Sequence, residues 1–375
     1  MSRVRVTTVS DPELNWDDPA TGRYLAALEA LGPDGALANA RYQLAALQLP
    51  DRVFPLVLPE GQQGCWLTSL TVTHGRALRD EIPRHLSGVA ALGARAVCLM
   101  LEALLRACRV DHSIYVNHLL FSTSLYGGWT GDGLEAALRA LRAEWPDRAI
   151  LLRSLNTADH ADLLSQMTAH GARLLPSRVV WRIPEPGRQW APRTDVKADL
   201  KLASAGGYRL ETTPDPSPAE IDDILGLYAG IYLAKYSRAN PAYSAAALGA
   251  AVRTGALRLV RVRAADGAVV AFVADHVSGG ELSSPLLGYD RDRPTSDGLY
   301  RIVMAAPVQR AVAEGLAVNY SAGAERFKRH RGAGPALEYL AVFDGHLPGW
   351  RRLGYAVLAR ALGLIKPMLE RMAAA

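Results

Sequence analysis

Residues 257–290, LRLVRVRAADGAVVAFVADHVSGGELSSPLLGYD, hold the pattern that decides the fold. Three apolar runs, at 257–264, 268–278 and 281–290, have the length and the valine and leucine content of β-strands. Asp266–Gly267 and Gly279–Gly280 separate these runs, and both pairs favour the positive φ angles of tight hairpin turns. The stretch therefore predicts a meander of three antiparallel strands.

Helical patterns surround this meander. Apolar residues recur at helical spacing over 219–238, and Ser217, Pro218 and Glu220 form a helix-start signal just before them. The other elements predicted from residue 207 onward are helices at 243–253, 296–315 and 324–332, and strands at 316–323 and 336–344. The order β-α-α-β-β-β-α-β-α-β predicts an α/β (α+β) fold, with a mixed, mostly antiparallel sheet flanked by helices.

The first half of the chain has a similar order of elements. Three predicted strands, at 44–50, 53–58 and 65–73, are followed by three helix–strand pairs, at 88–108 and 113–122, 134–144 and 149–155, and 161–170 and 174–183. Between the halves, 183–199 contains three prolines without regular periodicity, as inter-domain linkers do. We therefore predict two domains of one architecture, at 1–190 and 207–375, joined by a linker at 191–206.

Composition narrows the class of protein. The chain has 375 residues, of which 49% are apolar and 21% charged, so it is a foldable globular protein of about two domains. Three cysteines without a CxxC pair argue against a disulfide framework, and the N-terminus lacks the apolar run of a signal peptide. The apolar stretch at 353–365 is shorter than the ~20 residues that span a bilayer. We expect a cytoplasmic protein without a transmembrane segment.

The sequence lacks the motifs of several common enzyme classes. No GxxxxGK[ST], GxSxG or HExxH motif occurs, and no GxGxxG follows a strand. The nine histidines are scattered, so no metal site is predicted. The net charge of +5 comes entirely from residues 201–375, which hold 21 Lys and Arg against 16 Asp and Glu. A basic region of this kind often meets phosphate on a coenzyme, RNA or lipid, although a solvated surface is the alternative.

The densest basic segment is YSAGAERFKRHRGAGP, at 320–335. Within six residues it carries four cations, which are Arg326, Lys328, Arg329 and Arg331. If 324–331 is helical, Lys328 and Arg331 share one face and Phe327 points elsewhere as an anchor. Such a pair could hold a diphosphate or an oxyanion. A solvated basic helix is the alternative.

The run NYSAGAERFKRHRGA (319–333) resembles the acetyltransferase-like domain of the GNAT superfamily, in the group of BioF-like acetyltransferases and Fem-type aminoacyltransferases. In those families a G-x(2–3)-[FY]-K-x-x-[RF]-G element follows the fifth strand of the domain. The matching positions are Gly323, Phe327, Lys328, Arg331 and Gly332. The resemblance covers about 207–345, whereas 40–185 share only the element order. It implies tandem GNAT-like (acyl-CoA N-acyltransferase-like) domains.

The resemblance also implies where an activated donor binds. GNAT enzymes carry [QR]-x-x-G-x-[GA] at the start of the central helix, where backbone N–H groups bind the pyrophosphate of coenzyme A. Here the equivalent stretch is RPTSDGLYR (293–301), in which only Ser296, Asp297 and Gly298 could form such a cradle. The Asp297 carboxylate would repel a nearby phosphate, and a simple capping pair is the alternative. Arg326, Arg331 and Gly332 complete the predicted donor site.

Acyl transfer to an amine needs a deprotonated amine, a stabilised oxyanion and a proton for the leaving group. In the family that the sequence resembles, the splayed central strands place backbone N–H groups at the reacting carbonyl. No covalent enzyme intermediate is required there. The candidate proton carriers are Asp275, His276 and Tyr289, and because adjacent strand residues face opposite ways, only one of the first two can face a cleft. Lys328 is the leading candidate, as a partner of the oxyanion or of phosphate.

The first half offers candidates for acceptor binding. Asn117, Ser122, Arg153 and Asn156 lie near predicted strand ends, where they could line a cleft between the domains. Hydrogen bonding within the strand ends is the alternative for each. The helix predicted at 350–366 could lie on a membrane surface or cover RNA, but we expect its apolar face to pack on the second domain.

These observations predict an acyltransferase that transfers an acyl group from acyl-CoA to an amine of a small-molecule or peptidic acceptor. A Fem-type enzyme with an aminoacyl-tRNA donor is one alternative, and a non-catalytic binding protein with degenerate GNAT domains is another. No tightly bound cofactor is expected, because the donor is a co-substrate. DNA is not an expected partner, whereas tRNA remains one.

Overall fold

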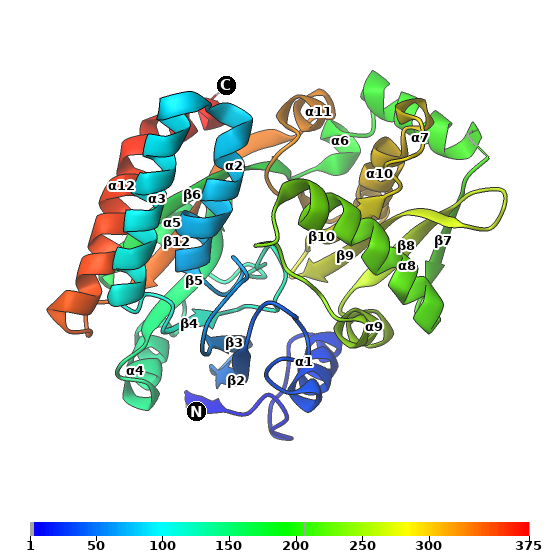
Figure 1. Ribbon diagram of the computed structural model, residues 1–375. Coiled ribbons are helices and arrows are strands. Elements are labelled where there is room, and N and C mark those ends of the chain that lie inside the picture. Colours follow the sequence, from blue (N-terminus) through cyan, green and yellow to red (C-terminus); the bar gives the residue numbers. More distant parts are fainter. Residues whose placement is uncertain (1–3, 206, 375) are drawn as a thin grey trace.

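The computed structural model describes residues 4–205 and 207–374. Its described strands form one sheet in the order β1-β2-β3-β4-β5-β12-β6-β11-β10-β9-β8-β7, with helices packed on its faces (Figure 1). This is the mixed α/β sheet, mostly antiparallel, that the sequence predicts. Its continuity from one half of the chain to the other places residues of both halves around common cavities.

The predicted meander is confirmed. Strands β8 (Arg258–Arg263), β9 (Val269–Ser278) and β10 (Glu281–Tyr289) pair antiparallel in succession, and β7 (Arg209–Thr213) adds to the β8 edge. Alternate side chains pack on opposite faces, as the period of two in a strand requires. Phe272 and Ala274 meet α8 (Pro218–Ala229), while Val273 meets α10 (Leu299–Glu314). The meander is thus the buried centre of the second half.

The helices of this half begin and end close to their predicted limits. Ser217 and Glu220 form a capping box at the start of α8. The helix continues as a π-helical segment, η2 (Gly230–Tyr236), and α9 (Ala245–Arg253) follows. A 3₁₀ turn, η3 (Thr295–Asp297), precedes α10, which accommodates Pro307, and α11 (Glu325–His330) is the predicted short basic helix.

Strands β10 and β11 (Ala317–Asn319) part where the catalytic centre is expected. The two strands run parallel, and their pairing covers only Glu281–Ser283 against Ala317–Asn319. Immediately beyond, the pairing of β10 with β9 shifts register between Ser283 and Leu286, around Ser284 and Pro285. Proline cannot donate a ladder hydrogen bond, so Pro285 fits such a bulge. The strands therefore open a gap between Ser284 and Tyr320.

The first half contains most of the predicted elements, but the strand predicted at 113–122 ends at Val116 and the one at 65–73 does not form. Its strands are β1 (Arg5–Thr7), β2 (Tyr42–Gln48), β3 (Val53–Pro59), β4 (Ser113–Val116), β5 (Ala149–Asn156) and β6 (Arg173–Ile183), and its helices include α1 (Pro19–Leu31), α4 (Leu134–Glu144) and α5 (Ala161–Ala169). The strand predicted at 65–73 is wrong. There Asp111 accepts hydrogen bonds from the Ser69 hydroxyl (2.8 Å) and the Thr71 amide (3.1 Å), and the chain turns into a π-helical segment, η1 (Val72–Ala77).

The last strand and helix cross the predicted domain boundary. Strand β12 (Gly334–Phe343) lies between β5 and β6 of the first half, and α12 (Gly349–Ala374) packs on β6 of the first half as well as on β12. The predicted linker is also more ordered than expected, since it contains α7 (Thr194–Ala205), which follows α6 (Pro186–Gln189). β12 and α12 therefore follow the predicted boundary at 191–206 in the sequence, yet they pack against strands that precede it.

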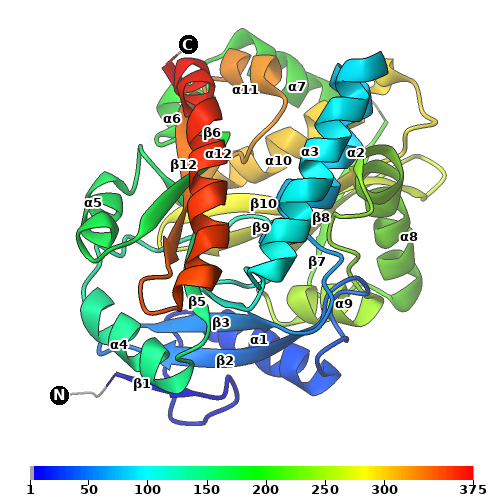
Figure 2. The ribbon, with the colours of Figure 1, turned by 60° about the vertical axis from the view of Figure 1, so that its left-hand side comes forward.

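Helices α2 (Leu78–His85), α3 (Gly88–Ala107) and α12 lie on one side of the molecule (Figure 2). In the described part of the chain, α3 is the one helix long and apolar enough to cross a membrane, and only 22% of its most apolar window is buried. The expectation of a protein without a transmembrane segment rested on the apolar run at 353–365 alone, whereas α3 does reach this length and hydropathy.

Candidate active site

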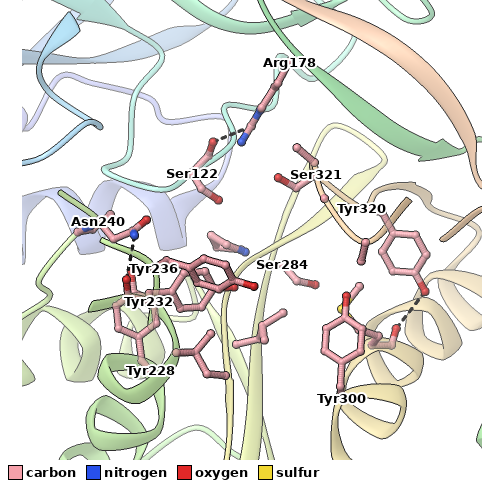
Figure 3. A pocket seen from close by; sticks show the side chains of 18 of the residues that line it. Ser122, Arg178, Tyr228, Tyr232, Tyr236, Asn240, Ser284, Tyr300, Tyr320 and Ser321 are labelled. Carbon is pink, nitrogen blue, oxygen red and sulfur yellow. Dashed lines mark hydrogen bonds between the residues drawn. The ribbon is translucent and has the colours of Figure 1, made fainter. Parts of the chain in front are cut away.

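A cavity of about 460 Å³ opens at the point where β10 and β11 part. Ser284, Pro285 and Leu287 of β10 line one side, and the segment 319–324 lines the other. We call it the tyrosine cavity, because seven of its lining residues are tyrosines, which are Tyr228, Tyr232, Tyr236, Tyr243, Tyr289, Tyr300 and Tyr320. Figure 3 shows Tyr232 and Tyr236 of η2 on one side of Ser284, and on the other side Tyr300 of α10 and Tyr320, which directly follows β11.

The tyrosine cavity is lined from both halves of the chain. Trp66, Ser122 and Arg178 come from the first half. Arg178 donates through Nε to Glu338 Oε1 (2.8 Å) and through Nη2 to the Ser122 carbonyl (3.1 Å, Figure 3). Trp66 Nε1 donates to the Asn240 side chain (2.9 Å), which ties the first half to the segment after η2. Because the sheet is continuous, the first half contributes the Arg178 guanidinium and the Trp66 indole to a cavity that is otherwise lined mainly by the second half.

The tyrosine hydroxyls give the cavity neutral proton donors. Tyr228 stacks on Tyr232 with ring centroids 4.7 Å apart, and Tyr289 lies 6.0 Å from Tyr300. Burial raises the pKa of Tyr289 and of Tyr300 above the usual tyrosine range. Both hydroxyls therefore keep their protons at neutral pH. Tyr289 is half-buried, and it is the predicted proton carrier that the structure brings into this cavity.

Lys328 lies in the wall of the tyrosine cavity and is only 3% exposed. Its Nζ donates to the carbonyls of Tyr320 (2.6 Å), Ser321 (3.1 Å) and Ala322 (2.7 Å). Since an ammonium group has three donors, these bonds use all of them. Burial lowers the pKa of Lys328 to about 7. Lys328 therefore fixes the segment after β11, and in this structure it has no free N–H for an oxyanion.

The other predicted donor-binding residues of this segment face away from the cavity. Arg331 pairs with Asp199 of α7 (Nη2 to Oδ1, 2.9 Å) and stacks on Phe327, with its Cζ 3.6 Å from the ring centroid. Gly332 has φ +83°, and a Cβ there would lie 2.1 Å from the carbonyl oxygen of Gln189. Arg326 is exposed. The cations predicted to converge on one anion are therefore separated, and Arg331 acts as a tie between α11 and α7.

The start of α10 is covered rather than open. Asp297 accepts a hydrogen bond from the Tyr208 hydroxyl (2.7 Å), and a Cβ on Gly298 would lie 2.2 Å from Leu202 Cδ2 of α7. Ser296, Asp297 and Gly298 do not line the tyrosine cavity. The predicted pyrophosphate cradle is thus occupied by side chains of this chain, and its nearest carboxylate is already hydrogen-bonded.

Asp275 and His276 line a different cavity, of about 500 Å³, which we call the aspartate cavity. Both reach it, whereas the alternation of strand side chains predicts only one facing a cleft. Asp275 forms an ion pair with Arg310, and burial raises the pKa of the Asp275 carboxyl group. His276 hydrogen-bonds through Nδ1 to the Ala256 carbonyl oxygen (3.0 Å), and burial lowers its pKa. The structure therefore separates these two residues from Lys328 and Tyr289.

The first-half candidates divide in the same way. Ser122 lines the tyrosine cavity, whereas Asn117 lines the aspartate cavity and donates to the Leu125 carbonyl (2.8 Å). Arg153 lies behind Trp66, with its Cζ 4.9 Å from that ring. The Asn156 Oδ1 accepts two backbone bonds of 3.0 Å in the turn after β5. Arg153 and Asn156 therefore contribute to packing and turn structure outside both cavities.

The aromatic lining and Arg178 were not among the residues predicted from the sequence. Tyr228, Tyr232 and Tyr236 recur every four residues within a predicted helix, which was a visible stripe on one face. Such a stripe is more often part of a core, so spacing alone did not distinguish the two uses. Arg178 had no local signal, because only the pairing of β6 with β12 brings Glu338 beside it. Among the described residues, no cluster of His, Cys, Asp or Glu could hold a metal ion.

Comparison with known proteins agrees with this architecture. Residues 193–329 match the family model described as the acetyltransferase (GNAT) domain. This match lies in the part of the chain whose basic segment resembles the GNAT superfamily. No curated protein matches its sequence.

Solved structures are similar in fold at low sequence identity. FemX aligns over 88% of this chain and 93% of its own, with a TM-score of 0.52 and 9% identity. A tandem GNAT protein from the clavulanic acid biosynthesis pathway aligns over 91% and 98%, with a TM-score of 0.42 and 14% identity. L-PGS from Bacillus licheniformis aligns over 60% and 77%, with a TM-score of 0.44 and 13% identity. The similarity to FemX shows that the fold extends across both halves of the chain.

Proposed function

We propose that this protein transfers an acyl group from an activated donor to the amine of a small-molecule or peptidic acceptor, and that the reaction takes place in the tyrosine cavity. The observation that carries the proposal is the parting of β10 and β11 at Ser283 and Asn319, directly into a cavity lined from both halves of the chain. The match of residues 193–329 to the acetyltransferase (GNAT) domain supports the class of reaction.

The chemistry follows from the groups that line the cavity. A neutral amine attacks the acyl carbonyl, a C–N bond forms, and the bond from the carbonyl carbon to the leaving sulfur or oxygen breaks. The amine loses a proton to water and the leaving group gains one. Tyr289 is the proposed acid, because its protonated hydroxyl belongs to the cavity lining; it gives its proton to the leaving group and regains one from water.

The backbone of the parted strands supports the oxyanion in this proposal. Carbonyl oxygen charge develops in the tetrahedral intermediate, and donors fixed in advance stabilise it most. The bulge at Ser284 and Pro285 turns β10 out of regular pairing beside the cavity. On the other strand, Lys328 holds the carbonyls of 320–322, so that the opposite wall keeps its shape. Lys328 is therefore a positioning residue here.

Arg178 and Glu81 are the charged groups through which the acceptor is recognised in this proposal. Both line the tyrosine cavity, and Arg178 keeps its guanidinium oriented through Glu338 and the Ser122 carbonyl. The Arg178 guanidinium can bind a carboxylate of the acceptor. The Glu81 carboxylate can bind the acceptor's ammonium group, which later loses its proton. An acceptor with an amine and an acidic group, such as an amino acid or a peptide end, fits this lining.

The donor is proposed to be acyl-CoA, and one observation favours a second candidate. The start of α10, where the pyrophosphate of coenzyme A would be expected, carries Asp297 and is packed by Leu202. An aminoacyl-tRNA donor does not need that cradle, so a Fem-type aminoacyl transfer is the second candidate. Both candidates use the same cavity and the same attack by an amine.

Thermal-shift titration with coenzyme A, acetyl-CoA and charged tRNA separates the donors. A ligand at ~100 times its Kd adds roughly 2.7 kcal/mol of stability, which gives a clear rise in Tm. We then expect formation of an amide from the bound donor and a panel of amino acids and short peptides. Loss of product on RNase treatment identifies the tRNA donor. A protein that neither binds these donors nor forms product would be a non-catalytic binding protein, contrary to the proposal.

A further inference from the structure

Exposed apolar side chains gather on α2, α3 and α12. Of the seventeen large apolar residues that are exposed in the described chain, thirteen lie between Leu78 and Met100 or on α12. Val89 is 85% exposed, Leu92 and Met100 are each 65% exposed, and Leu364 is 80% exposed. Soluble proteins usually scatter such residues singly over the surface. This concentration on one side of the molecule marks an interaction surface.

The inner side of α3 is packed against the protein, so α3 lies along the surface of the molecule. Cys98 and Leu105 are buried, and the buried Glu102 forms ion pairs with Arg79 of α2 and Arg106 of α3. At its C-terminal end, α3 meets α12, where a Cβ on Gly354 would lie 2.7 Å from Cys108 Cβ. The helix is therefore apolar outside and anchored by charges inside, which is the pattern of an interfacial helix rather than a spanning one.

The charges on the two helices identify the partner. The cations of α3 and α12 that are exposed or half-exposed are Arg95, Arg106, Arg352, Arg360, Lys366 and Arg371, and Glu370 is the one exposed acidic residue on them. A second copy of the chain docked symmetrically would bring these like charges together. An anionic lipid surface offers opposite charge, and long basic side chains can reach its headgroups while their neighbours enter the apolar layer.

We propose that the α3–α12 face docks on the surface of an anionic lipid bilayer, with both helices lying along the membrane plane. In this arrangement α2 lies between the bilayer and the tyrosine cavity, since Glu81 of α2 lines that cavity. Arg84 of α2 also contacts η2, with its Cζ 5.0 Å from the Tyr236 ring centroid. The docking does not depend on acyl transfer, and it brings one wall of the tyrosine cavity close to the membrane surface.

Co-sedimentation with vesicles tests this proposal. The full-length protein is mixed with vesicles of phosphatidylcholine alone, or with vesicles in which part of that lipid is replaced by phosphatidylglycerol. We expect binding to the anionic vesicles that weakens as salt is raised. Replacing Arg95 and Arg360 by alanine should lower the partition coefficient roughly 30-fold, because each basic residue at an anionic surface contributes about a fivefold factor.

A second variant tests the apolar part of the surface. Leu92→Glu together with Met100→Glu should lower vesicle binding by at least about tenfold, because two apolar side chains that would enter the lipid are lost and two negative charges face the anionic surface. Val312→Glu is the matched control, since Val312 is exposed on α10 away from this face, and it should bind as the unmodified protein does. Circular dichroism confirms that each variant is folded. Equal binding of the L92E/M100E variant, no binding to anionic vesicles, or a stable dimer that ignores vesicles would overturn the proposal.

Discussion

The tyrosine cavity and the aspartate cavity are close in size, at about 460 and 500 Å³, and both are lined by residues from the two halves of the chain. The aspartate cavity holds the residue types usually associated with catalysis, Asp275 and His276. Its carboxylate is paired with Arg310 and its imidazole with a backbone carbonyl. The tyrosine cavity holds neutral phenols at a break in strand pairing. In the function that we propose, the break in strand pairing, rather than residue type, distinguishes the reacting cavity from the other one.

The largest effect is expected from Lys328→Met. The substitution leaves the Tyr320 and Ala322 carbonyls without the Nζ donor, and each buried unsatisfied acceptor costs about 1–3 kcal/mol. The free energy of unfolding should fall by about 3 kcal/mol in urea titrations, with loss of acyl transfer. Arg326→Met, two residues away and exposed, is the control and should change stability by less than about 0.5 kcal/mol. Equal stability of the two variants would show that the lysine does not hold the cavity wall.

Tyr289→Phe tests the tyrosine cavity by its chemistry. Removing the hydroxyl should lower kcat roughly 100-fold while KM for the donor stays similar, because general acids contribute about 10²–10⁴ in rate. Tyr126→Phe is the matched change in the aspartate cavity, where the hydroxyl donates to the Arg153 carbonyl (2.6 Å). That variant should lose stability and keep kcat. The reverse pattern would move the reaction to the aspartate cavity.

The pH dependence of stability separates a buried lysine from a surface one. The pKa of Lys328 is lowered to about 7 in the folded protein from 10.5, so above pH 7 the unfolded chain binds more protons at this site. The unfolding free energy of the unmodified protein should therefore rise relative to Lys328→Met as pH increases above 7. The slope approaches about 1.4 kcal/mol per pH unit toward pH 9. A difference between the two proteins that is independent of pH would mean that the lysine is not desolvated.

The smallest effect is expected from Asp275→Asn. The substitution keeps the shape of the side chain, and Arg310 retains its ion pair with Glu314 (2.8 Å). Acyl transfer should stay within a factor of about three, since the residue lies in the aspartate cavity and touches neither Tyr289 nor Lys328. Initial-rate measurements over a range of acceptor concentrations check this. A selective fall in kcat with unchanged folding would restore Asp275 as a proton carrier.

Most strands and helices were predictable from the local pattern of apolar and turn-forming residues. The meander at 257–290 was predictable because its alternation and its glycine turns are encoded within each segment. The position of β12 between β5 and β6 was not predictable, since strand partners far apart in sequence leave no periodic signal. The strand predicted at 65–73 does not form. There the Thr71 amide donates a hydrogen bond to the side chain of Asp111, a residue forty positions later in the sequence.

The site was predictable only in part. Lys328, Tyr289 and Ser122 do line one cavity, whereas Asp275, His276 and Asn117 line another. Residue type suggested all six, but only the three-dimensional register of the sheet divides them between the cavities. The four-residue spacing of Tyr228, Tyr232 and Tyr236 was visible in the sequence, yet its meaning depended on the parting of strands next to it.

A crystal structure of the protein with acyl-CoA, or with a hydrolysis-resistant aminoacyl-tRNA end, tests the central claim most directly. We expect the donor carbonyl to lie in the tyrosine cavity, within hydrogen-bonding distance of the backbone between Ser283 and Leu286, with the Tyr289 hydroxyl near the leaving atom. A donor bound in the aspartate cavity, with its carbonyl beside Asp275 or His276, would contradict it.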